Sequence, residues 1–157
     1  MSISLRDYTP RDEDAAIALW LRTWQAAYPH IDFAVRLPWW RDRWCAELVP
    51  VAEIVVAESV VAEADSTHNY VMIGFVTIDP LTFYLDQIVV APEYWGLGVG
   101  EALIAEAKRR SPDGLDLDVN DDNERAIGFY SKQGFQVSGE GVNPISGKPI
   151  KRMSWRP

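Results

Sequence analysis

The sequence predicts an α/β (α+β) fold: a mixed, mostly antiparallel twisted sheet of about seven strands with helices on both faces. Three observations lead to this fold class. Apolar runs typical of strands recur along the whole chain, with three in succession near the middle. Segments with helical spacing of apolar residues stand before and after those three. A strand that follows a helix in the C-terminal half predicts one parallel crossover.

Length and composition indicate an ordinary globular protein. The 157 residues predict a single domain over 1–157, and 48% of them are apolar. No apolar run approaches the roughly 18 residues of a membrane span, and the N-terminal segment lacks the pattern of a secretory signal. Cys45 is the single cysteine, so no internal disulfide can form. We therefore expect a cytoplasmic protein with no membrane partner.

The charge balance limits the kinds of partner. A net charge of −8 argues against nucleic-acid binding, which normally requires a basic face. The negative electrostatic field of the protein mildly favours a cationic substrate. The alternative is that the negative charge only keeps the protein soluble. A phosphorylated ligand would have to be held by backbone amides and a few Lys or Arg side chains.

The first third of the chain predicts one strand and two helices. The alternating residues 3–7 predict the strand. Asp12 is expected to be the N-cap of a helix over 13–28. A second helix is expected over 33–48, and an interruption at Pro38 is left open.

Aromatic side chains are concentrated in these two helices. Trp39 and Trp40 are adjacent and cannot both face inward, so at least one of them is expected to be accessible. The remaining rings either belong to the core or line an acceptor pocket. They are Trp20, Trp24, Tyr28 and Trp44.

The middle of the chain predicts an antiparallel meander. Apolar runs over 54–61, 71–78 and 83–90 predict its three strands. The polar segment 62–69 predicts a hairpin connection, and Asp79 with the following proline predicts the next turn.

Helices and strands alternate in the C-terminal part. A Ser-Pro-Asp-Gly stop at 111–114 ends a predicted helix over 98–110. Asn123 and Gly134 are expected to begin and end another helix, as N-cap and left-handed C-terminal residue. The remaining strands are predicted over 115–119, 135–140 and 150–155.

Glycine occupies every second position in the loop that joins the third meander strand to a helix. Gly96, Gly98 and Gly100 allow a sharp bend and leave backbone amides uncovered. A helix start also has unpaired N–H groups and the positive end of the helix dipole. The loop therefore predicts a site for a phosphorylated ligand. A dinucleotide site is disfavoured, because the loop follows a meander and does not open a βαβ unit.

Two blocks of sequence resemble the GNAT superfamily of N-acetyltransferases. The block IVVAPEYWGLGVGEALI has both glycines of the Q/R-x-x-G-x-G/A signature, at 98 and 100, but has Trp95 in place of Gln or Arg. The block LDLDVNDDNERAIGFYSKQGF matches N-x-x-A…F-Y-x-x-x-G-F, from Asn123 to Phe135. The resemblance covers residues 83–140 and implies a sheet whose centre is splayed.

The resemblance implies acetyl-CoA as co-substrate, with no metal, and acetyl transfer to a primary amine. Pantetheine would pair with the edge of the strand before the glycine loop, and an N–H of Val89 or Val90 would polarise the thioester carbonyl. Lys132, and with it Arg125, either contacts the phosphates or is an ordinary surface charge. The implied co-substrate residues are Ile88, Val89, Val90, Trp95, Gly96, Leu97, Gly98, Val99, Gly100, Glu101, Asn123, Tyr130 and Lys132.

Two residues are implied as catalytic. Tyr130 would be the general acid that returns a proton to the thiolate, or it would only pack beneath its helix. Asp86 is the best candidate for the base. Its alternatives are binding a cationic acceptor amine or pairing with an arginine. Glu58 and Asp79 are weaker candidates for the base.

The acceptor is the least determined part of the prediction. Trp24, Tyr28 and Asp86 are expected to bind a small amine, an amino acid or a peptide amine, and a basic protein tail is left open. His30 and His68 are expected in loops, with His30 close to the acceptor entrance. An exposed tryptophan favours a homodimer. The alternative functions are a non-catalytic acyl-CoA sensor and an N-acyltransferase with a larger acyl donor.

Overall fold

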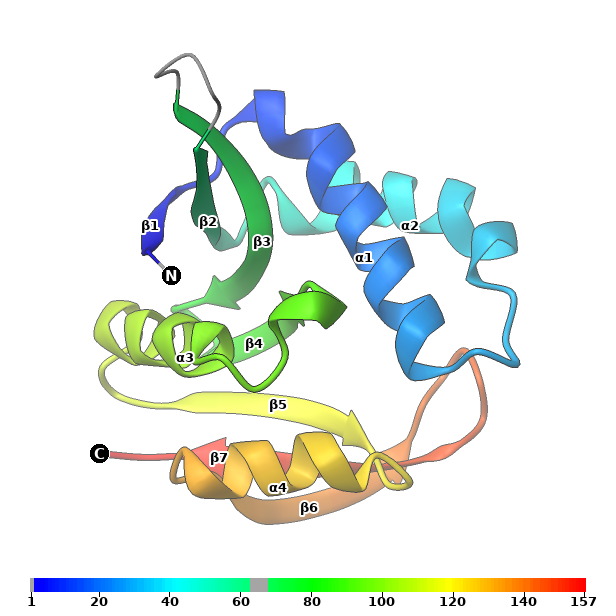
Figure 1. Ribbon diagram of the computed structural model, residues 1–157. Coiled ribbons are helices and arrows are strands. Elements are labelled where there is room, and N and C mark those ends of the chain that lie inside the picture. The colour runs from blue at the N-terminus through cyan, green and yellow to red at the C-terminus, as the bar shows by residue number, and fades with distance from the viewer. Residues whose placement is uncertain (1, 63–67) are drawn as a thin grey trace.

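The computed structural model describes residues 2–62 and 68–157, which form one seven-stranded sheet in the order β1-β2-β3-β4-β5-β7-β6 (Figure 1). All neighbouring strands are antiparallel except β4 and β5, which are parallel. The fold class predicted from the sequence is thereby confirmed. The strands are β1 (Ile3–Asp7), β2 (Glu53–Ala62), β3 (His68–Asp79), β4 (Tyr84–Val90), β5 (Leu115–Asn120), β6 (Gln136–Val142) and β7 (Pro149–Trp155).

Helices cover both faces of the sheet (Figure 1). Each face has its own apolar cluster. One cluster packs α3 and α4 against the sheet, and the other packs α1 and α2 against it. None of the helices in the described ranges is both long and apolar enough to cross a lipid bilayer. The helices are α1 (Glu13–Ala27), α2 (Leu37–Arg43), α3 (Val99–Arg110) and α4 (Glu124–Lys132).

The start of α1 differs from the prediction for Asp12. Its side chain does not cap α1, and instead accepts two 2.8 Å hydrogen bonds from the guanidinium of Arg6 on β1. The backbone N–H of Thr9 donates a third bond to the same carboxylate, at 2.8 Å. Asp12 is buried, so a charged partner on β1 outweighs the local capping role. Arg6 thereby lowers the pKa of the Asp12 carboxyl.

The second predicted helical segment is present but is divided into a 3₁₀, an α and a π segment. A short 3₁₀ helix (Phe33–Arg36) precedes α2, and a π-helical turn (Trp44–Leu48) follows it. Pro38 does not interrupt the helix, because it lies in the first turn of α2, where its missing N–H has no intrahelical acceptor. Trp40 is buried whereas Trp39 is 43% exposed, as their adjacency predicts.

The meander of β2, β3 and β4 is antiparallel as predicted. Most of the predicted polar connection, residues 63–67, lies outside the described residues. His68 corrects one expectation: it is the first residue of β3 and pairs with Ala62, so it belongs to a strand. The strands of this hairpin are longer than the apolar runs, because backbone pairing extends into polar residues.

A bulge in β4 determines which way its side chains point. Thr77 of β3 pairs with Gln87 and Ile78 pairs with Leu85, which leaves Asp86 as an extra residue. Such a residue shifts the alternation of the strand. Leu85 therefore belongs to the α3 cluster while Val89 belongs to the α1 cluster, although the two are an even number of residues apart.

The C-terminal elements follow the prediction closely. The side chain of Asn123 accepts a 3.2 Å hydrogen bond from the N–H of Ala126 and so caps α4. Gly134 ends that helix with φ 90°, in the left-handed region. β5 follows α3 and is parallel to β4, so the predicted crossover is confirmed.

The parallel strands β4 and β5 separate almost at once. Tyr84 and Asp116 are the single pair between them, supported by a 2.7 Å bond from the N–H of Asp116 to the carbonyl of Phe83. Across the described lengths of both strands, no further pair follows towards Val90. The splayed centre that the resemblance implies is therefore present, and one edge of β4 faces the gap.

The ion pair of Asp12 gives a first prediction. Asp12→Asn should lower the free energy of unfolding at pH 7 by about 2 kcal/mol, because Arg6 loses a charged hydrogen-bond partner. The folded-state pKa of Asp12 is lowered, so its contribution is present above the unfolded pKa of about 4 and disappears as pH falls through the folded value. Urea denaturation from pH 7 to pH 3 should show the two proteins converging in acid.

The matched control is Asp14→Asn, which removes an exposed carboxylate from the first turn of α1, two residues after Asp12. Its effect should stay below about 0.5 kcal/mol. Equal effects of the two substitutions at pH 7 would contradict the role given to the buried pair.

Candidate functional site

The edge of β4 that faces the gap presents backbone groups that pair with no neighbouring strand. Val90 lies opposite Gly74, and the N–H of Ala91 donates to the carbonyl of Ile73 at 2.8 Å. This pattern marks Val90 and Gly74 as a non-hydrogen-bonded pair, so the N–H and carbonyl of Val90 point away from β3. Ile88, two residues earlier, has the same orientation. The groups of Val89 point towards β3, so of the two amides considered from the sequence only that of Val90 faces the gap.

Two glycines of the loop after β4 are required by backbone conformation. Gly96 has φ 78° and Gly98 has φ 92°, both in the left-handed region that side chains disfavour. A Cβ at either position would meet no atom within 4 Å, so the space beside them is open. Gly98 immediately precedes α3 and directs the chain into that helix.

Gly100 has a different role from the other two glycines. A Cβ there would lie 3.0 Å from the ring of Phe129, so its absence lets α3 and α4 approach closely. The first-turn amides of α3, from Val99 to Glu101, have no acceptor within the helix. The N–H of Leu97 already donates to the carbonyl of Tyr94 at 3.3 Å. An anion would therefore be bound by the amides that begin at Gly98.

Trp95 connects the end of β4 to α4. Its indole N–H donates a 2.7 Å hydrogen bond to the carbonyl of Val90, which faces the gap. The guanidinium carbon of Arg125 lies 3.9 Å from the centroid of the Trp95 rings. Lys132 is exposed at the far end of α4. The departure from the family signature at position 95 therefore places an aromatic side chain, with an arginine on it, beside the glycine loop.

Tyr130 lies on α4, among the residues that pack against the α3 cluster. Its ring contacts Phe129 and Phe135, with centroids 5.4 and 5.7 Å away. Within the described residues its hydroxyl makes no hydrogen bond, and burial raises the pKa of the phenol. Tyr130 is therefore protonated at neutral pH and has a donor available.

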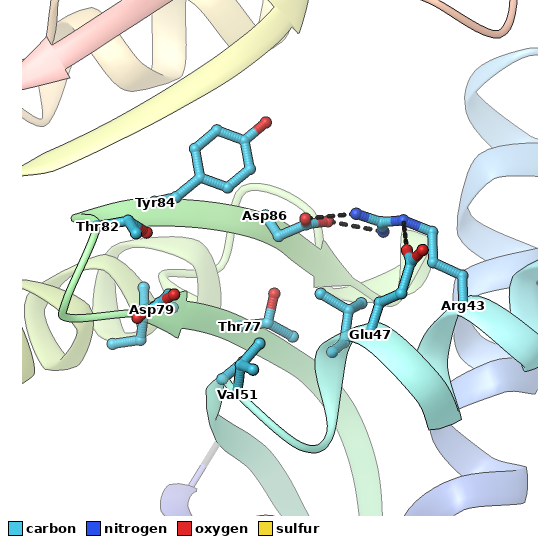
Figure 2. A pocket seen from close by; sticks show the side chains of 11 residues that line it. Arg43, Glu47, Val51, Thr77, Asp79, Thr82, Tyr84 and Asp86 are labelled. Atoms are coloured by element: carbon cyan, nitrogen blue, oxygen red, sulfur yellow. Dashed lines mark hydrogen bonds and ion pairs between the residues drawn. The ribbon is translucent and has the colours of Figure 1, made fainter.

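Asp86 lies on the face of the sheet that α1 and α2 cover, opposite to the face that holds Tyr130. There an arginine of α2 holds its carboxylate. The guanidinium of Arg43 on α2 donates to both carboxylate oxygens, at 2.9 and 2.6 Å (Figure 2). Nε of Arg43 also lies 3.3 Å from a carboxylate oxygen of Glu47. The side-chain amide of Gln87 donates a 3.0 Å bond to Asp86. Of the alternatives considered for Asp86, pairing with an arginine is present.

A cavity of about 120 Å³ lies beside this ion pair (Figure 2). Three carboxylates and one guanidinium line it, so its charge is net negative. Asp79 is one of these carboxylates and also accepts a 3.0 Å bond from the N–H of Leu81 in the turn after β3. The lining residues are Arg43, Glu47, Leu48, Val51, Ala52, Thr77, Ile78, Asp79, Thr82, Tyr84 and Asp86.

Other candidates divide between this region and the rest of the molecule. Trp24 and Tyr28 stack at the end of α1, and the hydroxyl of Tyr28 accepts a 3.4 Å bond from the amide of Asn120 on β5. His30 is exposed and contacts the edge of Tyr28. Glu58 instead pairs with Arg6 at 2.6 Å, on the far side of β3 from the gap. It is not brought to the site.

Several residues at the site are not among those predicted from the sequence. Tyr84 donates a 2.9 Å hydrogen bond to Asp118 of β5, next to the point where the strands separate. Arg152 of β7 lies 3.2 Å from the same carboxylate. The alternation of LDLDVN could have placed Asp118 on the polar face of β5. Nothing local indicated that Arg43 would reach Asp86. In the described ranges, no group of three or more His, Cys, Asp or Glu side chains could hold a metal ion.

The chain belongs to the acetyltransferase (GNAT) family, whose model matches residues 14–135. The prediction of an N-acetyltransferase of this superfamily is thereby confirmed. A curated relative, the peptidyl-lysine N-acetyltransferase YiaC of Escherichia coli K12, is 32% identical over 151 residues, which are 96% of this chain and 95% of that protein.

Solved structures agree with this assignment. The apo form of YjaB from Escherichia coli has a TM-score of 0.73 and 28% identity, and the match covers 99% of this chain and 98% of that one. The PaiA N-acetyltransferase of Thermoplasma acidophilum, in complex with coenzyme A, has a TM-score of 0.70 over the whole of both chains. It is 22% identical, so it supports the fold alone.

The conformation of the glycine loop gives a second prediction. Gly98→Ala should lower the free energy of unfolding by roughly 1–2 kcal/mol, because alanine is strained at a left-handed φ. Gly128→Ala is the matched control, since Gly128 lies within α4 and has open space around it. That substitution should be neutral or stabilising by up to about 1 kcal/mol. Thermal and urea unfolding of the two variants would test the difference, and equal effects would contradict it.

Proposed function

We propose that the protein is an acetyl-CoA-dependent peptidyl-lysine N-acetyltransferase that transfers the acetyl group directly. One observation carries the proposal: the unpaired edge of β4, with Ile88 and Val90, leads directly into the glycine loop at the start of α3. An extended pantetheine arm requires such an edge, and a pyrophosphate requires such a helix start. The relatives named above support the acceptor class.

The donor side follows from these backbone groups. Pantetheine amides would pair with Ile88 and Val90, and an N–H of this edge would polarise the thioester carbonyl. The phosphates would lie against the amides from Gly98 to Glu101, where the left-handed glycines leave open space. Lys132 would contribute a charge from α4. Asn123 is occupied as the cap of α4, and its free amide N–H₂ can still donate to the arm.

The reaction needs a neutral amine and a proton for the leaving sulfur. The amine nitrogen attacks the thioester carbon, forming the C–N bond, and the C–S bond then breaks to release the CoA thiolate. Tyr130 would give its phenolic proton to that thiolate. Burial raises the pKa of the phenol, so the proton is present at neutral pH. The proton lost from the nitrogen passes to a base or to water. The products are then an amide and the free thiol of CoA.

The environment of Asp86 favours acceptor binding over the role of base. Both of its oxygens already accept bonds from Arg43, and the pair lies in a cavity with two further carboxylates. This net negative lining attracts an ammonium group such as that of a peptidyl lysine. Trp24 and Tyr28 do not line this cavity, and their stacked rings would contact another part of the peptide.

The overall test combines donor binding with an acceptor panel. Acetyl-CoA should raise the melting temperature, and mass spectrometry should detect acetylated lysine in peptides. Lysine-free peptides with a free N-terminus and small polyamines would be compared at equal concentration. Exclusive modification of the N-terminus or of polyamines would overturn the acceptor class. Binding of acetyl-CoA without acetylation of any amine would favour the sensor.

Tyr130→Phe tests the general acid. It should lower kcat by about 10²–10⁴-fold while the Kd for acetyl-CoA changes little, because only the proton donor is removed. Tyr70→Phe is a matched control, since Tyr70 is exposed on β3 and its hydroxyl lies outside the site. Unchanged turnover of the Tyr130 variant would show that another group protonates the sulfur.

Asp86→Asn separates the two roles of this carboxylate. If it binds the ammonium group, KM for a lysine peptide should rise by about tenfold or more, with kcat reduced less and the pH profile of kcat retained. If it is the base, kcat should fall and the corresponding limb of the pH profile should disappear. Asp79→Asn, in the same cavity, serves as the control for charge alone.

A further inference from the structure

Trp95 and Arg125 form a contact across the split sheet. The Trp95 ring is fixed at the end of β4 by its 2.7 Å hydrogen bond to the carbonyl of Val90. Arg125 comes from the first turn of α4, on the other half, and its guanidinium carbon is 3.9 Å from the ring centroid. This distance is well within the range of a cation–π contact, and Arg favours such stacking on Trp.

A second contact fixes this turn of α4 beside the glycine loop. The ring of Phe129 lies where a Cβ of Gly100 would be, at 3.0 Å. Phe129 is four residues after Arg125, so the two side chains lie on the same face of the helix. Trp95 and Gly100 bracket the glycine loop, and each contacts one of these residues. The guanidinium of Arg125 is therefore held next to the loop.

The charge of Arg125 is not neutralised by the protein. Arg6, Arg22, Arg43 and most other arginines pair with carboxylates. Over the described ranges Arg125 forms no ion pair or hydrogen bond, and its recorded contact is the Trp95 ring. Stacking uses the face of the guanidinium and leaves its N–H edge free. That planar edge matches the oxygens of a phosphate.

We infer that Arg125, positioned by Trp95, binds a phosphate of the acyl donor. This inference rests on the proposed use of acetyl-CoA and adds the residue that supplies the positive charge. The amides of the glycine loop offer partial charges, whereas the chain as a whole has a net charge of −8. The guanidinium of Arg125, held beside that loop, supplies a full positive charge, which the neutral indole of Trp95 cannot supply.

The test uses two donors that differ in their phosphates. Acetyl-CoA carries the pyrophosphate and the 3′-phosphate, whereas S-acetylpantetheine has the same thioester and arm without any phosphate. Arg125→Ala should lower kcat/KM for acetyl-CoA by about 10- to 100-fold, mainly through KM. It should leave kcat/KM for S-acetylpantetheine within about twofold of the wild type. Equal losses with both donors would overturn the inference.

Variants at Trp95 test the positioning role. Trp95→Phe keeps a ring for stacking but loses the indole N–H, and should retain more acetyl-CoA affinity than Trp95→Ala. In the double variant with Arg125→Ala, loss of the ring should add little, because the two residues act as one unit. Fully additive losses would show that Trp95 does not act through Arg125.

Two controls keep the outcomes distinct. Arg36→Ala removes an arginine that also lies over an aromatic ring, that of Phe33 in the same 3₁₀ helix. Arg36→Ala should not change acetyl-CoA binding, because Arg36 belongs to the 3₁₀ helix before α2 and not to α4 or the glycine loop. Melting temperatures would establish that each variant is folded. If the wild type did not bind acetyl-CoA, the proposed function and this inference would both be wrong. If the wild type and Arg125→Ala bound it equally, only the inference would be wrong.

Discussion

The separation of β4 from β5 is the constraint on which the rest of the molecule depends. Buried backbone groups must find partners, and a strand inside a sheet normally meets this need on both edges. Here the pairing stops after Tyr84 and Asp116, so Ile88 and Val90 direct their N–H and carbonyl groups into the gap. The indole of Trp95 satisfies one of those carbonyls. The remaining groups make the gap a place where an extended ligand can act as a missing strand.

The bulge at Asp86 assigns the two faces of β4 to different tasks. Because the alternation shifts there, Ile88 faces the α3 and α4 layer, whereas Asp86 and Val89 face α1 and α2. The open backbone edge lies between these layers. Tyr130 on one side and the Arg43–Asp86 pair on the other therefore belong to separate compartments. This arrangement suits a reaction whose two substrates reach one carbonyl carbon from different sides.

Local signals predicted the fold and the backbone of the glycine loop well, because the features concerned are local. The cap at Asn123, the left-handed Gly98 and Gly134, and the order of elements depend on a few neighbouring residues. The contacts that the sequence did not indicate join residues of different secondary-structure elements. Asp12 was expected to cap a helix but binds Arg6 of another element. The Arg43–Asp86 pair spans 43 residues, and only the folded sheet brings its members together.

The single Tyr84–Asp116 pair has a mechanical consequence. Within the described residues, the two halves of the sheet share no ladder of backbone hydrogen bonds beyond this point, so widening the gap there would break no strand pairing. Its cost is determined instead by side-chain contacts. The apolar cluster beneath α3 includes residues of β4 and β5 and joins the two halves. The polar contacts across the gap, such as the 3.4 Å bond between Asn120 and Tyr28 and the stack of Arg125 on Trp95, are each worth about 1 kcal/mol or less where solvent has access. The open end of the gap can therefore adapt its width to what lies within it, while the shared apolar cluster beneath α3 keeps the two halves together.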